Sequence, residues 1–424
     1  MSGQALTTKP LEGGRTAALL AEAAERFGTP CYVTDLGVLD LRARELGAAF
    51  PDPWVRQYSL KANPLPAVVG CLARSSFGAN AVSSGEWAAA TAAGLGNDLI
   101  TLEGIGKTDT DLESAVAAAS MGRPLRWVTL ESTEEAEQLS RMAKAAGLGQ
   151  VPNGIDVLLR LNPEVVPETS VDLGVGAKSS KFGMTRPEIL EWVEANRRFP
   201  SGLLLRGIHV HVGSQLRAVR AWVEAAVQAC RLLRELSQLS TEMDTVDFGG
   251  GFPAGELSSP TPAEFRKALD DALAQAGLPL PPRPAVEPGR YFVATAGWIV
   301  SRVLHVRRRA EGQQVVIDAS FAELIRPALY GARHEIFAIR GDQAIAEKEC
   351  ESTLVEGSLC ESTDTFGLHQ LPSLSRGDLV AIAGAGAYSS SMFSSYNGRP
   401  RPAEVLIQPD LTLSLARAAS PFVP

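Results

Sequence analysis

A lysine, two histidines and a glutamate stand at the ends of apolar, strand-like runs of this sequence. Lys61 is the last residue but one of the run QYSLKA, His209 and His211 alternate in the run RGIHVHV, and Glu287 stands just before the final proline of RPAVEP. A lysine that is partly desolvated at such a position becomes nucleophilic toward an aldehyde. Because most lysines at strand ends are simply solvated, Lys61 alone predicts no chemistry.

The two histidines point to the same face of their strand because they alternate. His211 lies nearer the strand end, where a flat imidazole could stack on an aromatic cofactor, whereas His209 is better explained by core packing. A carboxylate such as Glu287 could keep a pyridine nitrogen protonated, although a lone carboxylate could equally be a loop anion.

A glycine-rich turn follows one candidate strand, and a Gly-Arg pair follows the next. Gly249, Gly250 and Gly251 have no Cβ, so several backbone N–H groups could converge on an anion there. Arg290, which follows Gly289, adds a cation, and Ser214 could donate a further hydrogen bond. A flexible turn is the alternative, but a position after the last two strands of a barrel favours phosphate binding.

These residues need a scaffold, and the hydrophobic pattern predicts one. From about residue 55 to 290, short apolar runs alternate with longer stretches of helical period, which is typical of βαβ units. Eight runs predict an α/β protein with a TIM-like (β/α)8 barrel over residues 38–295. The candidate strands are 57–62, 79–82, 98–103, 126–131, 155–162, 205–212, 244–249 and 283–288.

Strand-like runs without long helices follow after about residue 295 and predict a second, mostly β domain of sandwich or barrel type. The strand-like run 31–36 precedes the barrel, so it is expected to pair with this domain. The second domain is therefore assigned to residues 1–37 and 296–424.

Composition excludes several classes of protein. The net charge of −8 and the absence of a long basic run argue against nucleic acid. Five widely spaced cysteines without a CxxC pair suggest neither disulfides nor a metal site, and they fit the reducing cytoplasm. No apolar run is long enough to span a membrane or to act as a secretion signal.

Nine ordered motifs resemble the fold-type III pyridoxal 5'-phosphate (PLP) decarboxylases, a family that includes the diaminopimelate, ornithine and biosynthetic arginine decarboxylases. They run along nearly the whole chain: YSLKANP, SSGEW, SKFGM, HVHVGSQ, DFGGGF, EPGRYFV, LIRPALY, LCESTDTF and GAYSSSMFSSYNGRPRPAEV. LIRPALY, LCES and YNGRPRPAEV are most similar to diaminopimelate decarboxylase. This resemblance implies a PLP-dependent carboxy-lyase that acts as a homodimer with shared active sites.

The resemblance also implies roles for the matched positions. Lys61 would carry PLP as a Schiff base, His211 would stack on its ring, and Glu287 would pair with the ring nitrogen. The phosphate would be surrounded by Ser214, Gly249, Gly250, Gly251, Gly289, Arg290 and Tyr388. Arg326 and Tyr330 would hold a substrate carboxylate, with Arg290 and Tyr388 nearby. Cys360 and Glu361 would come from the partner subunit, with Cys360 as a proton donor to the product carbanion.

Three departures from the family pattern concern the choice of substrate. The segment 163–184 (PEVVPETSVDLGVGAKSSKFGM) lacks the THxxIxTG-like stretch of diaminopimelate decarboxylases, Asn80 replaces a more usual aspartate, and DASFAEL replaces a DAGMNDL-like run. Two substrates stay open: meso-diaminopimelate, giving lysine, or another amino acid, free or bound to a carrier protein. A racemase of the same fold would have no use for the CES segment, and a catalytically dead regulatory homologue would be expected to lose Lys61 or Cys360.

Overall fold

The computed structural model describes residues 15–149, 154–196, 202–238, 242–255, 259–340, 343–344 and 350–421. The chain divides into two compact units, one formed by Arg42–Gly289 and the other by Met1–Leu41 together with Arg290–Pro424. The expected borders lie within six residues of these, at 37/38 and 295/296, and residues 1–14 of the expected second domain lie outside the described residues.

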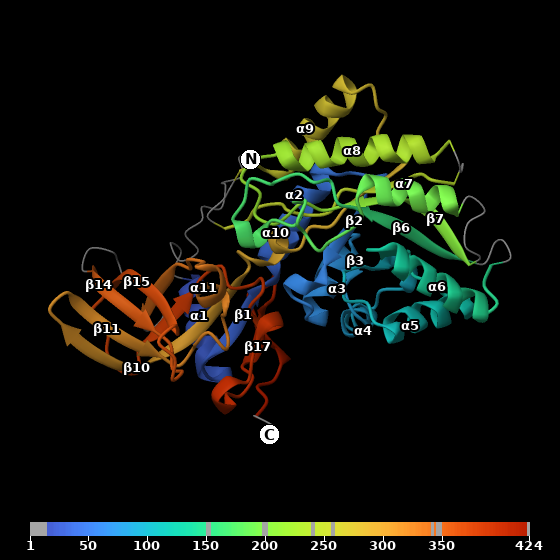
Figure 1. Cartoon of the computed structure of the whole chain (residues 1–424). Helices are drawn as coiled ribbons and strands as arrows, with labels where there is room; N and C mark the ends of the chain where they lie inside the picture. Colours follow the sequence, from blue (N-terminus) through green and yellow to red (C-terminus); the bar gives the residue numbers. More distant parts are fainter. Residues whose placement is uncertain are drawn as a thin grey trace. The chain divides into compact units, whose positions relative to one another are not determined.

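Eight parallel strands of the first unit form a closed barrel, as the sequence predicts (Figure 1). Each strand pairs with the next in chain order, and the last pairs with the first. The strands are β2 (Val55–Ser59), β3 (Gly78–Ala81), β4 (Ile100–Leu102), β5 (Trp127–Leu130), β6 (Ile155–Leu161), β7 (Leu203–Val210), β8 (Thr245–Asp247) and β9 (Arg283–Val286).

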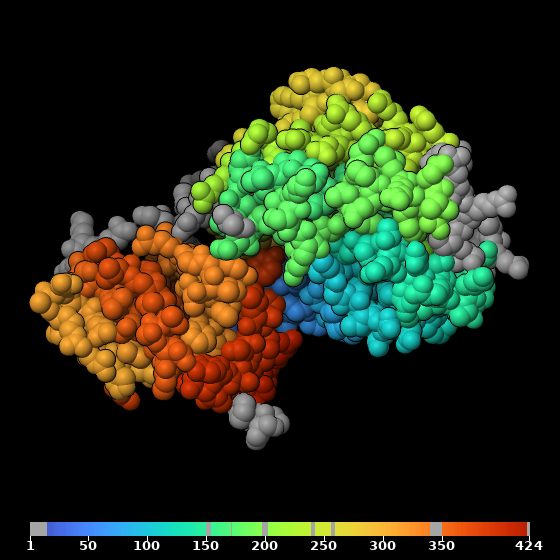
Figure 2. All heavy atoms as spheres, viewed as in Figure 1, coloured from blue at the N-terminus to red at the C-terminus, as the bar shows by residue number. Residues whose placement is uncertain are grey.

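Helices connect the strands and cover them from outside, which explains why every residue of β3, β4, β5 and β8 is buried. Helices α5, α6, α7 and α8 form the face of the barrel unit shown in Figures 1 and 2. Capping boxes at Thr108, Thr185 and Thr261 begin three of the helices. The helices are α3 (Pro66–Arg74), α4 (Ser84–Ala92), α5 (Asp109–Ser120), α6 (Thr133–Ala145), α7 (Arg186–Ala195), α8 (Arg220–Leu236) and α9 (Pro262–Gln275).

The second unit is built around one sheet of ten strands. Strand β1 (Cys31–Asp35) lies within it, antiparallel to β10 (Gly297–Arg309) and parallel to β17 (Ala403–Ile407), so the expected pairing of the run 31–36 is confirmed. The other strands are β11 (Gly312–Ile317), β12 (Ile336–Arg340), β13 (Gln343–Ala344), β14 (Cys350–Glu356), β15 (Thr365–Pro372), β16 (Leu379–Ile382) and β18 (Leu413–Arg417).

Two hydrophobic cores stabilise this sheet. Helix α1 (Arg15–Phe27) places Ala17, Leu20 and Ala23 in one core, with Val33 of β1 and Val405 of β17. The other core lies between β10, β11, β12, β14, β15 and β16. Helix α2 (Leu36–Ala49) crosses the border between the units, and two short helices, α10 (Arg290–Val293) and α11 (Arg326–Tyr330), belong to the second unit. No helix in the described part of the chain is long and apolar enough to cross a bilayer.

Candidate active site

Lys61 lies in a short 3-10 turn, Leu60–Ala62, directly after β2. Its neighbours Leu60 and Ala62 are buried, but its own side chain is exposed, so the expected partial desolvation is wrong for this chain. The reason is local: the strand ends at Ser59, and the turn carries the lysine out of the barrel wall. The ammonium charge of Lys61 nevertheless influences the pKa values of Glu86, His211 and Glu287, which places it at the carboxyl ends of the strands.

His211 follows β7 and is held as a neutral ring. Its Nδ1 accepts a hydrogen bond of 3.1 Å from the backbone N–H of Gly250, so the ring proton must lie on Nε2. Burial lowers the pKa of His211 well below its usual value, and the charges of Lys61 and Arg160 lower it further. A neutral, fixed imidazole is suited to stacking against a flat ring, as the sequence predicts for this residue.

The glycine turn after β8 is used differently from the expectation. Gly249 donates its N–H to Asp247 Oδ1 at 2.9 Å and Gly250 donates to His211, so two of the three N–H groups hold the site itself together. An alanine at Gly249 would place its Cβ 2.8 Å from His211 Nδ1, and at Gly250 only 2.5 Å from the carbonyl of Glu287. The turn needs glycine for close packing. Of its three glycines, Gly251 alone has an N–H for which the described residues provide no acceptor.

The segment 163–184, whose sequence departs from the family pattern, packs against the loop that follows His211. The backbone N–H of Ser214 donates to Leu173 at 3.1 Å, and the Thr169 hydroxyl donates to the Ser214 carbonyl at 2.6 Å. Val175 and Gly176 both donate to the carbonyl of Val212. The unusual segment therefore positions Ser214, one of the predicted phosphate ligands.

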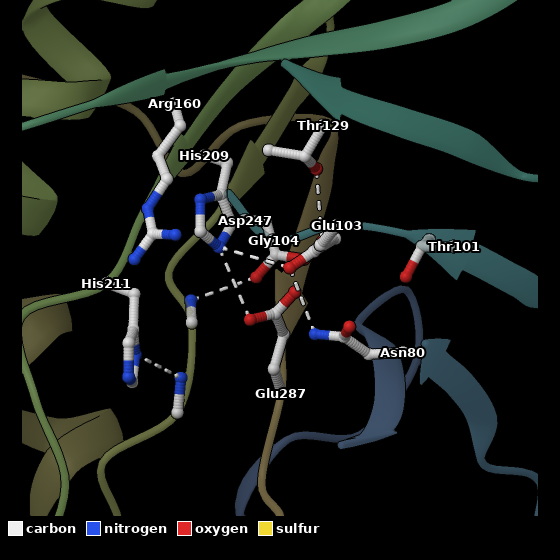
Figure 3. A network of polar contacts seen from close by, with 12 residues as sticks. Asn80, Thr101, Glu103, Gly104, Thr129, Arg160, His209, His211, Asp247 and Glu287 are labelled. Atoms are coloured by element: carbon white, nitrogen blue, oxygen red, sulfur yellow. Dashed lines mark hydrogen bonds and ion pairs between the residues drawn. The ribbon is translucent and has the colours of Figure 1, made fainter. Parts of the chain in front are cut away.

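Three ionisable side chains meet in the barrel interior, as Figure 3 shows. His209 Nε2 lies 3.3 Å from Glu287 Oε2 and 3.6 Å from Glu103 Oε2, and all three side chains are buried. His209 is thus buried as expected, but in a polar network and not in an apolar core. The three residues offer ligand atoms within 4.8 Å of one another, a spacing that a metal ion could also bridge.

Glu103 is a buried carboxylate of this network that accepts hydrogen bonds from two neighbouring side chains. It accepts hydrogen bonds from Asn80 Nδ2 at 3.0 Å and from the Thr129 hydroxyl at 3.1 Å. Burial alone would raise the pKa of Glu103, but the charge of His209, hydrogen bonds with Glu287 and Thr129, and the charge of Arg160 bring it below its usual value.

Glu287 is in the opposite situation. Burial and the neighbouring Glu103 carboxylate raise its pKa well above the usual value. Its side chain shares a hydrogen bond with Glu103 and lies 3.3 Å from His209 Nε2. A buried carboxyl group directly after β9 can pair with a ring nitrogen, so the residues present fit a pyridine cofactor.

Sequence reasoning missed Glu103, Asp247 and the buried ion pair of Arg160 with Glu131, in which Nη1 and Oε1 are 2.5 Å apart. Glu131 also accepts the N–H of Gly183, and the Arg160 guanidinium lies over the Phe182 ring, so this pair holds the KFG motif in place. A signal for these residues was present in the sequence, namely a glutamate at the end of a predicted strand. Glu103 and Glu131 end the predicted strands 98–103 and 126–131, and Glu287 lies at the end of the strand 283–288.

In the second unit, two predicted phosphate ligands lie together. The Arg290 guanidinium, at the start of α10, lies over the Tyr388 ring with 4.6 Å to the ring centroid. Tyr388 has a φ of +57°, a left-handed conformation that non-glycine residues rarely adopt and that often marks functional sites. Gly289, immediately before Arg290 in the chain, packs against Ser59 in the barrel unit.

The two predicted carboxylate ligands share helix α11. Arg326 begins the helix and donates from Nη1 to His334 Nε2 at 3.1 Å, while Tyr330 ends it and is exposed. His334 Nδ1 in turn donates to the carbonyl of Ala383 at 2.8 Å, which fixes the imidazole as the acceptor for Arg326. Sequence reasoning did not identify His334 as the residue that orients Arg326.

Cys360 and Glu361 are exposed on a loop that the Asp364 side chain holds in place through hydrogen bonds. The buried Asp364 carboxylate accepts the N–H of Phe321 at 2.7 Å and the N–H of Leu359 at 2.8 Å. Glu361 accepts a hydrogen bond of 2.5 Å from the Tyr396 hydroxyl. The structure thus presents both predicted partner-subunit residues to the outside on an ordered loop.

Comparison with known families decides the class of the protein. Residues 36–294 match the family model described as the pyridoxal binding domain of pyridoxal-dependent decarboxylases. The chain belongs to the pyridoxal-dependent decarboxylase family. The predicted family resemblance is confirmed, and so is the fold that it implies.

Relatives within this decarboxylase family cover nearly the whole chain. The diaminopimelate decarboxylase of Deinococcus radiodurans is 34% identical over 91% of this chain and 92% of its own length. The crystal structure of the M. jannaschii diaminopimelate decarboxylase in complex with L-lysine has a TM-score of 0.85 at 28% identity, and covers 97% of this chain and 95% of that one. The corresponding Helicobacter pylori enzyme, also with L-lysine, has a TM-score of 0.84 at 28% identity, and covers 95% of this chain and 97% of that one.

Proposed function

We propose that this decarboxylase converts meso-diaminopimelate to L-lysine and CO2 with PLP as its cofactor. The family assignment supports the decarboxylation, and the relatives named above support the substrate. The observation that carries the proposal is the combination of a fixed, neutral His211 with Glu287, a buried carboxyl group directly after β9.

Each residue has a defined task in this proposal. Lys61 holds the cofactor covalently, His211 supports its ring, and Glu287 pairs with its nitrogen. Ser214, Gly251 and Arg290 bind the phosphate, with Gly249, Gly250 and Gly289 shaping the turns and Tyr388 lying against Arg290. When bound, PLP withdraws electrons from the bond to the departing carboxylate, which is the chemistry that no side chain of the protein supplies.

The second unit would handle the substrate and the returning proton. Arg326, held by His334, and Tyr330 bind a substrate carboxylate, and Glu361 binds the distal ammonium group. Cys360 Sγ delivers a proton to the Cα atom after CO2 has left. We propose that Cys360 and Glu361 act in the active site of a second copy of the chain, because both are exposed on an ordered loop.

Incubation of the PLP-loaded protein with meso-diaminopimelate tests the proposal directly. We expect equal amounts of lysine and CO2, and their loss in Lys61→Ala together with the visible absorbance of the lysine-linked cofactor. A wild-type protein that binds PLP but leaves diaminopimelate intact would contradict the substrate assignment. A product that retains the carboxyl group would contradict decarboxylation.

The dimer can be tested through Cys360. Of the five cysteines, Cys31, Cys71 and Cys230 are buried, Cys350 is partly exposed and Cys360 is exposed. A thiol reagent should therefore modify Cys360 first, with Cys360→Ser as the control for assignment. We expect protection of Cys360 as protein concentration rises into the dimeric range, and equal reactivity at all concentrations would contradict the shared site.

A second substrate class is favoured by one observation. The segment 163–184 contacts Val212 and Ser214 through backbone hydrogen bonds, so its unusual sequence lies beside the proposed phosphate ligands. We propose as the alternative a different acidic amino acid, free or attached to a carrier protein. Turnover of an aspartyl or glutamyl substrate, with none of diaminopimelate, would establish it.

A further inference from the structure

The buried carboxyl groups of Glu103 and Glu287 accept different hydrogen bonds, and this difference shows which of the two carries a proton. Glu103 accepts hydrogen bonds from Asn80 and Thr129, at 3.0 and 3.1 Å. Glu287 receives one longer contact of 3.3 Å, from His209. Because donated hydrogen bonds stabilise the ionised form of a carboxyl group, the negative charge belongs on Glu103 and the proton on Glu287.

The identity of residue 80 allows this distribution. Asn80 donates an N–H to Glu103 from the neighbouring strand β3. An aspartate at this position could not donate while ionised, and it would repel Glu103.

We propose that Glu103 is a positioning residue that keeps a proton on Glu287, ready for the cofactor ring nitrogen. This inference rests on the proposed role of Glu287. When the ring nitrogen arrives, the O–H bond of Glu287 breaks and an N–H bond forms with the nitrogen lone pair. Glu287 is left as a carboxylate beside the protonated ring, and no proton has to enter from solvent.

The other charged groups around the pair are compatible with this transfer. Burial lowers the pKa of His209 and raises that of Asp247. Arg160 is compensated by Glu131. The groups whose charge reaches Glu103, Glu287 or both are Lys61, Arg160, His209 and Asp247.

Glu103→Gln removes the charge and keeps the shape. The amide oxygen can accept from Asn80, and its NH2 group can donate to the Thr129 oxygen, so the fold is retained. Without the repulsion of the Glu103 charge, Glu287 gives up its proton more readily, and a larger share of the ring proton comes from solvent. Calorimetric titration with PLP in buffers of different ionisation enthalpy should show uptake of more protons per cofactor than in the wild type.

Two further variants make the calorimetric result specific. Glu323→Gln is the matched control, because Glu323 is an equally buried carboxylate in the second unit that accepts from Ser320. We expect it to leave the proton count unchanged. Asn80→Asp combined with Glu103→Gln moves the carboxylate to position 80 and should restore the wild-type count. An unchanged count in Glu103→Gln would overturn the proposal, and so would a double variant that stays like Glu103→Gln.

Infrared spectroscopy tests the inference without any cofactor. The wild-type minus Glu287→Gln difference spectrum should contain the C=O stretching band of a protonated carboxylic acid, and the same difference in the Glu103→Gln background should lack it. Absence of the band in the wild type would overturn the proposal. Failure of PLP to bind the wild type would contradict the proposed function instead, and the infrared result would still stand.

Discussion

His334 gives the second unit a defined response to acid. The ring is buried, accepts from Arg326 and donates to the Ala383 carbonyl. Burial lowers the pKa of His334 to about 4, with a further contribution from the positive charge of Arg326. A protonated ring could no longer accept the Arg326 hydrogen bond, so protonation would set two positive charges against each other.

The size of this effect follows from the shift in pKa. An unfolded histidine titrates near 6.5, and the folded His334 near 4. Because the folded pKa is the lower one, the stabilisation is complete above about pH 6.5 and is lost as the pH falls toward 4. A shift of this size corresponds to about 3 kcal/mol of unfolding free energy.

Urea unfolding of the wild type and of His334→Gln across this pH range measures the effect. The glutamine carbonyl can still accept from Arg326 but does not titrate, so we expect the variant to lose less stability on acidification. His305→Gln, at an exposed histidine of β10, is the control and should follow the wild type. Parallel pH profiles for wild type and His334→Gln would refute the reasoning. In the wild type, KM should rise over the same range as Arg326 loses its partner.

Three further predictions follow from single contacts. Gly250→Ala forces a Cβ to 2.5 Å from the Glu287 carbonyl, and overpacking of about 1–3 kcal/mol should weaken PLP binding by roughly 5- to 150-fold in an absorbance titration. Gly106→Ala, which has open space, should bind normally, and equal affinities would contradict the packing argument. Asp364→Asn leaves one of two buried N–H donors without an acceptor, at a cost of about 1–3 kcal/mol, and should lower the melting temperature and speed thiol modification of Cys360. Unaltered modification would show that Asp364 does not hold the loop. Asn80→Asp should destabilise the protein increasingly as pH rises, because two adjacent carboxylates then compete for one proton; a loss that is independent of pH would argue against charge repulsion.

The sequence was sufficient for the architecture because periodicity and strand count are local properties. Every predicted barrel strand overlaps a strand of the closed barrel, and the predicted pairing of the run 31–36 with the second unit is present. Lys61, His211 and Glu287 could be located because strand ends of a barrel converge at one face.

Hydrogen-bond partners could not be predicted, because they depend on which side chains the fold brings together. The exposed position of Lys61 follows from a single 3-10 turn that no sequence motif predicts. The glycine N–H groups were assigned to a phosphate, but Asp247 and His211 accept two of them. His334 is eight residues from Arg326 in sequence, and Asn80 is 23 residues from Glu103, so neither contact has a characteristic spacing.

The position of β1 has a consequence for synthesis of the chain. Residues 42–289 are contiguous, so the barrel can begin to fold as soon as they have left the ribosome. Strand β1 is made earlier, but its partner β10 begins at residue 297 and its partner β17 at residue 403. The strand CYVTD therefore stays unpaired while most of the chain is translated. In nascent chains that are halted before β17, we expect this strand to be accessible to chaperones and prone to aggregation.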